Sequence, residues 1–231
     1  MKRRIALIAC LLAAVLLAVV LAVSGSAAPD VSAAKAVAVG PRIDPDYTSI
    51  VIPPNIAPLN FRIREPGRDF FVRISAGNAP AIEIHCPDGI CRIPAASWRK
   101  LLGSATGGEI HYDVFAEQKP GEWVRFKQVT NTVAAEPIDS CIVYRRLVPN
   151  RAYSIIKGIF QRDLESFDSS ALVTAREGSS TCFNCHTFCQ NDPNKFIYHV
   201  RGDLKGMMVV ADGKTRKINT KQGPMFRPLA Y

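Results

Sequence analysis

Apolar and polar residues alternate with a period of two from about residue 49 to residue 146, and this pattern predicts β strands in this part of the chain. In LNFRIR, Leu59, Phe61 and Ile63 would share one face of a strand. About seven such runs, separated by turns that contain Gly and Pro, follow one another at a spacing of roughly 8–12 residues. We therefore expect an antiparallel β-sandwich of immunoglobulin or fibronectin type over residues 47–147, with a single helical turn in SWRKLL (97–102).

The N-terminal segment, residues 1–24, has the composition of a membrane anchor or a signal peptide. Three basic residues precede an unbroken apolar run from Ile5 to Val23. A spanning helix needs ~17–25 apolar residues and a signal-peptide core ~7–15, but the small residues of SGSAAPD also offer a cleavage site. Either reading sends the rest of the chain across the membrane, because the basic end stays inside. The Ala-rich residues 25–46 are expected to form a linker.

A second unit is expected over residues 148–231. In RAYSIIKGIFQRDLESF (151–167), apolar residues recur at steps of three and four, which predicts an amphipathic helix of about four turns. Near the C-terminus, GMMVVADGKTRKIN predicts a β-hairpin with Asp212 and Gly213 at its turn. The predicted fold class is thus mainly β, with a small unit that contains this helix.

The sequence Cys182-Phe-Asn-Cys185-His186 is the C-x-x-C-H motif of covalent c-type haem. Two thiols separated by two residues reach the two vinyl groups at one edge of the porphyrin. The next residue is then held below the ring, where its imidazole meets the iron. The motif favours one covalent haem c, attached at Cys182 and Cys185 and ligated by His186.

Three other readings of this cluster stay open. Zinc needs four ligands, which Cys182, Cys185, His186 and either Cys189 or His199 would supply. A redox dithiol would be expected to open a helix after a strand in a βαβ unit, and no such unit is visible in the pattern. The last alternative is a plain disulfide.

For the opposite face of the iron, the sequence offers His199 first, with Met207 and Met208 as alternatives or no protein ligand at all. His/His ligation would give a lower reduction potential than His/Met ligation, and an open site would bind small ligands. Met207 and Met208 are also well explained as core residues of a strand.

The remaining cysteines suggest disulfides. HCPDGICR predicts a hairpin in which Cys86 and Cys91 face each other as a non-hydrogen-bonded pair, within disulfide reach. An oxidising compartment would preserve that bond. With Cys10 set aside as an ordinary residue of the apolar N-terminal run, Cys141 and Cys189 are left, and they would either bond to each other or remain as free buried thiols.

The net charge is +9, and the excess lies late in the chain. Residues 195–231 hold eight Lys or Arg against two Asp, which indicates a solvated basic face that could steer an acidic partner. No basic motif interleaved with aromatic residues is visible, so we do not expect nucleic-acid binding.

The chain resembles a bacterial family whose members join an N-terminal β domain, a single C-x-x-C-H site and WD-type, TolB-like propeller repeats. The matching stretches include VIPPNIAPLNFRI, NTVAAEPIDSCIVYRRLVP, GIFQRDLESF, CFNCHTF and FIYHVRG. The resemblance implies haem attachment at Cys182 and Cys185, axial ligation by His186, and an iron or propionate role for His199 and Arg201. Such proteins continue for several propeller blades beyond FRPLAY, so this chain is expected to be a shortened relative or a truncated one.

These observations lead us to expect a membrane-tethered, extracytoplasmic monohaem c-type cytochrome, at the bacterial inner membrane facing the periplasm, or periplasmic or secreted if the N-terminal segment is cleaved. It would pass single electrons to a redox partner with an acidic surface and would be an electron-transfer or binding protein rather than an enzyme. The alternatives are a haem-based sensor or peroxidase-like protein with an open sixth site, or an interaction module in which haem or zinc is a structural staple.

Overall fold

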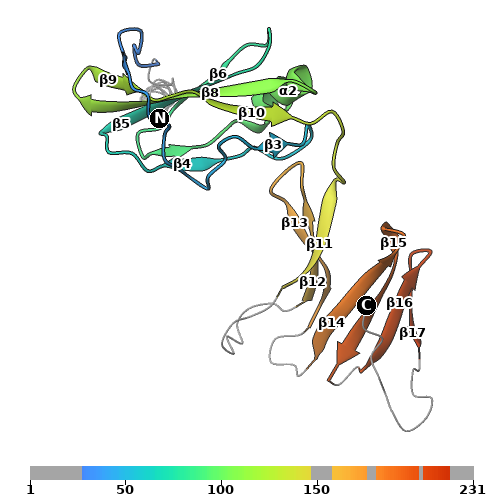
Figure 1. Ribbon diagram of the computed structural model, residues 1–231. Coiled ribbons are helices and arrows are strands. Elements are labelled where there is room, and N and C mark those ends of the chain that lie inside the picture. Colours follow the sequence, from blue (N-terminus) through green and yellow to red (C-terminus); the bar gives the residue numbers. More distant parts are fainter. Residues whose placement is uncertain (1–27, 147–157, 176–180, 203–204, 219–231) are drawn as a thin grey trace, which may run out of the picture. The chain divides into compact units, whose positions relative to one another are not determined.

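The computed structural model describes residues 28–146, 158–175, 181–202 and 205–218, and it is mainly β, as predicted (Figure 1). The chain divides into two compact units. The first is built from residues up to Ile52 together with Leu59–Ala134, and the second from Pro53–Pro58 together with the residues after Ala134. The predicted N-terminal anchor or signal, residues 1–24, lies outside the described residues. Within the described ranges, no helix has the length and apolar character needed to cross a membrane.

The first unit is organised around one long strand, β8 (Glu109–Lys119). Consecutive residues in the middle of this strand are buried, so both of its faces are covered. β5 (Asp69–Ser75) pairs with one edge of β8, and β9 (Glu122–Arg125) and β10 (Val129–Val133) follow one another along the other edge. The outer strands β1 (Lys35–Ala36) and β3 (Val51–Ile52) are short and run parallel to β9 and β10, so the sheet is not purely antiparallel, which differs from our expectation. The remaining strand of this sheet is β6 (Ile82–His85), which pairs with β5.

A second sheet of the first unit packs against the first. It consists of β2 (Ile43–Asp44), β4 (Phe61–Ile63) and β7 (Ile90–Cys91). The ring of Phe61 meets the ring of Tyr112 on β8 edge to face, with 6.4 Å between the ring centroids. The prediction that Phe61 and Ile63 share the inward face of their strand is confirmed, because both are buried.

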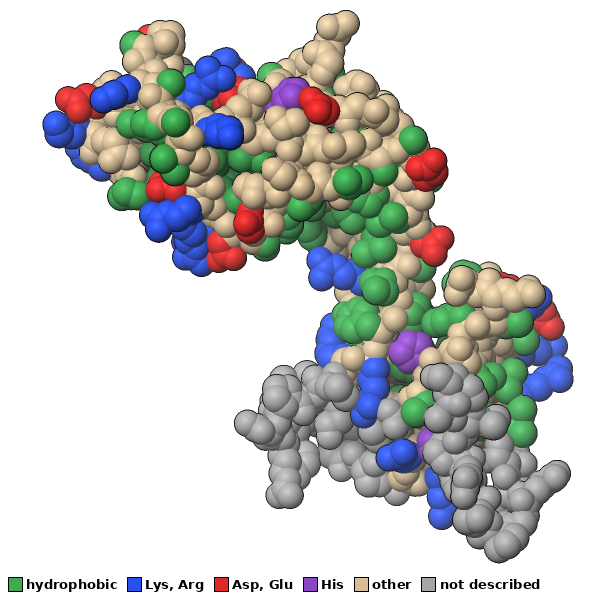
Figure 2. Space-filling view, viewed as in Figure 1, with side chains coloured by type: hydrophobic (Ala, Val, Ile, Leu, Met, Phe, Trp, Pro, Cys, Tyr) green, Lys and Arg blue, Asp and Glu red, His purple; other side chains and the backbone are tan. Residues whose placement is uncertain are grey.

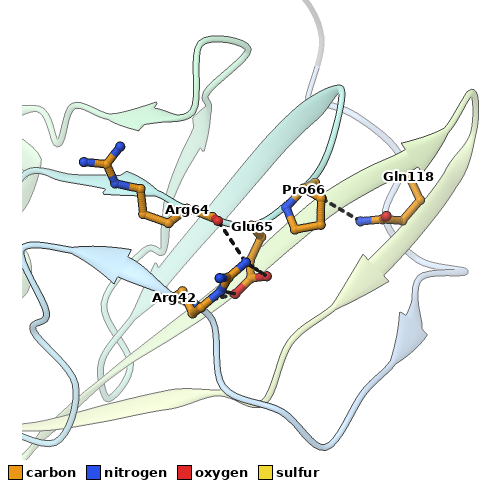
Figure 3. Close-up of polar contacts among 5 residues, drawn as sticks. All are labelled: Arg42, Arg64, Glu65, Pro66 and Gln118. Carbon is orange, nitrogen blue, oxygen red and sulfur yellow. Dashed lines mark hydrogen bonds and ion pairs between the residues drawn. The ribbon is translucent and has the colours of Figure 1, made fainter.

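Polar contacts fix the chain where it passes between these two sheets (Figure 3). The Arg42 guanidinium donates to a Glu65 carboxylate oxygen at 3.2 Å and to the carbonyl of Arg64 at 3.2 Å. Next along the chain, the Gln118 side chain on β8 donates to the carbonyl of Pro66 at 2.8 Å. The residues after β4 are thus tied both to the segment before β2 and to the first sheet.

The predicted single turn at 97–102 is too short. The structure has an eleven-residue helix, α2 (Ala95–Ala105). Its buried residues are Trp98, Leu101, Leu102 and Ala105, which is helical spacing. The segment contains no β-branched residue, and its Gly103 lies near the end, so the helix continues over three turns rather than one.

The predicted hairpin between Cys86 and Cys91 is also wrong. β6 pairs with β5 in the first sheet, whereas β7 pairs with β4 in the second. A turn separates them: the N–H of Gly89 donates to the carbonyl of Cys86 at 2.8 Å, and Gly89 has a φ of +71°. The turn therefore carries the chain from one sheet to the other instead of folding it back on itself.

The second unit begins with a three-stranded antiparallel sheet where a helix had been predicted. The sheet is formed by β11 (Cys141–Arg146), β12 (Gly158–Asp163) and β13 (Ser169–Thr174). The apolar spacing that suggested a helix over 151–167 comes instead from a strand followed by a turn, where Asp163 accepts from the N–H of Glu165 at 2.7 Å. Phe167 is 54% exposed, which a residue of a buried helical stripe would not be. Residues 151–157 of that prediction lie outside the described residues.

A four-stranded antiparallel meander follows, made of β14 (Cys182–Cys189), β15 (Asp192–Arg201), β16 (Gly206–Ala211) and β17 (Lys214–Ile218). The predicted hairpin at the end is confirmed by the pairing of β16 with β17. Asp212 and Gly213 at its turn both have positive φ, as a type I′ turn requires. The two sheets of this unit meet in a core of buried Ile159, Phe183, Tyr198 and Val200.

Candidate functional site

The C-x-x-C-H motif lies on strand β14, and the strand is irregular within the motif. Asn184 pairs with His199 and His186 pairs with Tyr198, so Cys185 is an extra residue between two consecutive pairs of the ladder. Its φ is +37°, in the left-handed region that residues other than glycine rarely adopt. This is a β-bulge, a feature that re-aims side chains and is common beside functional sites.

The bulge decides which face of the sheet carries His186. Cross-strand partners share a face, and successive residues alternate, so His186 is on the face of Tyr198 and away from the face of His199. Ring contacts agree with this placement. His186 lies 6.1 Å from Phe188, and Phe188 lies 5.0 Å from Phe196, both measured between ring centroids. Phe196 then continues to Tyr198 at 5.9 Å, so the imidazole ends a row of aromatic rings.

A hollow of about 570 Å³ lies between β11 and the β14–β15 hairpin, on this same face. Small-molecule sites in proteins have volumes of ~300–1,000 Å³. Its wall contains the half-buried His186 and, on β11, the half-buried Cys141. The lining residues are Asp139, Ser140, Cys141, Ile142, Val143, His186, Thr187, Phe188, Asn191 and Pro193.

The two attachment cysteines differ in what the structure describes. Cys185 is exposed at the bulge and is a free thiol, so it is accessible for reaction. The backbone of Cys182 pairs with Arg201, and its side chain lies outside the described residues. A thiol followed directly by an imidazole is the donor chemistry that covalent haem c uses, but Cys185 is not among the residues that line the hollow beside His186.

His199 and Met207 lie on the other face of the meander. They are cross-strand partners and are 3% and 5% exposed. Burial, and secondarily the charge of Arg201, lower the pKa of His199 below its ordinary value. Met208 pairs with Tyr198 and packs against the core of this unit. The structure therefore does not bring His199 or Met207 to the face that carries His186.

The same separation bears on the zinc reading. His186 and His199 point to opposite faces of the β14–β15 ladder, so they do not converge on one ion. Among the described side chains, no group of three or more His, Cys, Asp or Glu residues is close enough to hold a metal.

Cys141 and Cys189, predicted either to bond or to remain as thiols, are both free thiols in the structure. Cys141 is half-buried and lines the hollow, whereas Cys189 is exposed at the end of β14. A bond between them stays a prediction.

Cys86 and Cys91 come into contact although they are not hairpin partners. They are 1% and 0% exposed. The hydrogen bond that the Cys91 thiol makes to Cys86, together with burial, raises the pKa of Cys91. Contact between the two thiols places a disulfide within reach, and its formation stays a prediction.

Sequence reasoning missed that Cys141 lines the same hollow as His186. The alternation of CIVYRR would have put Cys141 on the face of Val143, which packs against the core. Which sheet that face meets depends on contacts between distant strands, and no local pattern contains that information.

Charges are distributed differently over the two units on the face drawn in Figure 2. Basic and acidic side chains are interspersed on the first unit, while Lys and Arg predominate on the described part of the second. This agrees with the basic excess of residues 195–231.

No protein-family model matches the chain, and no curated protein matches it either.

Proposed function

We propose that this chain is a monohaem c-type cytochrome module that transfers single electrons. The observation that carries the proposal is the C-x-x-C-H motif on a bulged strand. The bulge leaves the Cys185 thiol exposed and turns His186 toward a hollow of about 570 Å³. When bound, the haem would supply one-electron chemistry at its iron.

On the protein's side, attachment would use the two thiols of the motif. The S–H of Cys182 and of Cys185 would each add across a vinyl group, so that a C–S bond forms and the proton goes to the neighbouring carbon. The addition has no leaving group and does not change the oxidation state of the iron. His186 would bind the iron through one ring nitrogen, and its exposure as a half-buried residue leaves it accessible for this.

The rest of the site would set the environment of the iron. Phe188 and Val143 border the hollow and exclude water from one side, and burial is one of the levers by which a protein tunes a haem potential. Asp139 and the open side of the hollow keep part of it accessible. Electron transfer needs such an accessible edge, through which a partner can approach.

The remaining parts of the proposal follow the resemblance to TolB-like propeller proteins with a single haem site. The first unit would be an immunoglobulin- or fibronectin-like spacer or docking domain. The N-terminal segment would place both units on the periplasmic side of the bacterial inner membrane. The basic surface of the second unit would steer a redox partner with an acidic surface.

An absorption spectrum of the full chain, produced with a haem-maturation system, tests the function. We expect a Soret band and sharp reduced bands that do not change with carbon monoxide. The double variant Cys182→Ala/Cys185→Ala is the control and should lose all haem absorption. A spectrum that shifts with carbon monoxide would instead support a sensor or a peroxidase-like protein. A wild-type chain without a Soret band would contradict any haem function and leave zinc or a disulfide.

A further inference from the structure

The charged residues of the meander are sorted between its two ends. Cys182 on β14 and Arg201 on β15 are cross-strand partners, and we call the end where they lie the attachment end. Asp192 begins β15 at the opposite end, and Asp212 lies there as well, in the turn between β16 and β17. These are the two acidic residues in the described part of the meander, and each has a lysine within three residues of it in the sequence. Positive charge at that end is therefore balanced by nearby carboxylates.

The attachment end carries basic side chains instead. Arg201, Lys205 and Lys217 are all exposed. The N–H of Lys205 donates to the carbonyl of the residue after Arg201 at 3.2 Å, so the chain turns directly at this end. The side chain of Lys217 on β17 runs toward the same turn, because a Cβ atom on Gly206 would lie 2.7 Å from the Cε atom of Lys217. The turn also contains Asp203, which lies outside the described residues, and this single carboxylate leaves an excess of positive charge.

The first sheet of the second unit follows the same separation. Ile159 on β12 packs in one core with Phe183 of the attachment end, and its cross-strand partner on β11 is Arg145. Asp139, in contrast, lines the hollow together with Asn191, which lies at the opposite end of the meander. Arg145 therefore belongs to the attachment side of the unit and Asp139 to the other side.

The two ends are far enough apart for a partner to sense them separately. A strand rises ~3.3 Å per residue, so the Cα atoms of Lys214 and Lys217, three residues apart on β17, are separated by ~10 Å. At an ionic strength of 0.1 M the Debye length is also about 10 Å, and exposed charges farther apart than this are largely screened. An anion that approaches Cys182 is consequently attracted by Lys217 more than by Lys214.

We propose that the attachment end is the docking surface for a protein redox partner whose own surface carries carboxylates. The inference rests on the proposed function, because a haem bonded to Cys182 would lie beside Arg201. Complementary charge would bring the partner to the haem, and one electron would be lost by one redox centre and gained by the other. The position of these charges beside the attachment site favours a redox protein over an anionic membrane, since lipid headgroups do not exchange electrons.

The test measures how fast hexacyanoferrate(III), a small anion, oxidises the reduced haem of the matured full chain at an ionic strength of about 0.1 M. Each oxidation moves one electron from the haem iron to the reagent. Lys205→Glu and Lys217→Glu should each slow this reaction by ~3-fold. Both variants should speed oxidation by the cation tris(phenanthroline)cobalt(III), which a general loss of activity would not do.

The matched controls are Lys195→Glu and Lys214→Glu, which change the net charge by the same amount at the opposite end. They should alter either rate by less than ~1.5-fold. Poly-L-glutamate presents carboxylates as the expected partner would. It should inhibit the hexacyanoferrate(III) reaction of wild-type protein and inhibit the double variant Lys205→Glu/Lys217→Glu less.

The remaining outcomes overturn the inference. If haem is attached but Lys214→Glu slows the anion as much as Lys217→Glu does, the attachment end has no special role and the cytochrome proposal survives. The same holds if the rates do not change while Lys205→Glu/Lys217→Glu loses binding to phosphatidylglycerol vesicles, which would make this end a membrane contact. A wild-type chain without the haem mass would overturn the proposed function together with the inference.

Discussion

His186 is the cross-strand partner of Tyr198, although a regular strand would have placed it on the face of His199. The reason is the extra residue Cys185, which has no partner in the ladder and a φ of +37°. One bulged residue therefore decides whether the imidazole faces the hollow beside β11 or the opposite side of the meander.

The bulge gives a direct prediction for stability. An L-residue in the left-handed region costs ~1–2 kcal/mol, which glycine avoids, although glycine also loses more entropy on folding. We expect Cys185→Gly to raise the free energy of unfolding of the haem-free protein by ~0.5–1 kcal/mol. Cys189→Gly is the matched control: it is exposed on the same strand but does not have a positive φ, so it should lower stability. Denaturant titration followed by circular dichroism measures the free energy of unfolding of both variants. Equal losses of this free energy in the two variants would contradict the strained backbone at Cys185.

Arg146 should stabilise the first sheet of the second unit through an aromatic ring. Its guanidinium lies 3.7 Å from the ring centroid of Phe160, and it donates to the Tyr144 hydroxyl at 3.3 Å. Arg146→Met keeps the apolar stem and removes the charge, and we expect it to cost ~0.5–1 kcal/mol of unfolding free energy. Arg162→Met, an exposed arginine on the neighbouring strand β12, should change it by less than ~0.5 kcal/mol. Equal losses of unfolding free energy in the two variants would show that the contact between Arg146 and Phe160 does not stabilise the sheet.

Stability should depend on pH through His199. Burial and the charge of Arg201 lower the pKa of His199, so the unfolded chain takes up a proton at a higher pH than the folded chain does. The free energy of unfolding should therefore fall as the pH drops through about 6.5, and level off below the lowered pKa. In the haem-free protein, His199→Gln should remove this part of the pH dependence and Arg201→Gln should weaken it. An unchanged slope in His199→Gln, measured by denaturation between about pH 5 and 8, would show that this histidine is not the group responsible.

Cys86 and Cys91 should form a disulfide when the protein folds under oxidising conditions. Their thiols are in contact and buried, and the bond would join the residue after β6 in one sheet to β7 in the other. Closing so short a loop is expected to add about 2 kcal/mol to the free energy of unfolding. Reduction of wild-type protein, or the variant Cys86→Ala/Cys91→Ala, should remove that increment. Alkylation of both thiols in oxidised, denatured protein would contradict the bond.

Much of the mainly β fold could be predicted because alternation is a local signal. It indicated the strands around Phe61 and in β8, and the Asp212-Gly213 turn was sufficient to predict the last hairpin. For residues 158–167 the pattern predicted a helix, because Phe160, Leu164 and Phe167 have helical spacing. In the structure Phe160 is on a strand and Phe167 is in the turn after it. A short apolar segment does not by itself distinguish a strand from a helix. Here residues 158–163 form a strand because they pair with β11.

The candidate site was predictable only in its chemistry. The motif names Cys182, Cys185 and His186 because its spacing is local. The sequence offered His199 as the opposite ligand, but the bulge places His186 on the face of Tyr198, away from the face of His199. That Cys141 lines the same hollow as His186 could not be predicted from the sequence, because it depends on how two sheets pack.

The intact mass of the full chain, produced with a working haem-maturation system and denatured before measurement, tests the central claim most directly. A covalent haem survives denaturation, so we predict wild-type protein heavier than its polypeptide by the mass of one haem. The Cys182→Ala/Cys185→Ala variant should have the polypeptide mass alone. A wild-type protein with only the polypeptide mass, in cells that mature a control c-type cytochrome, would contradict the claim.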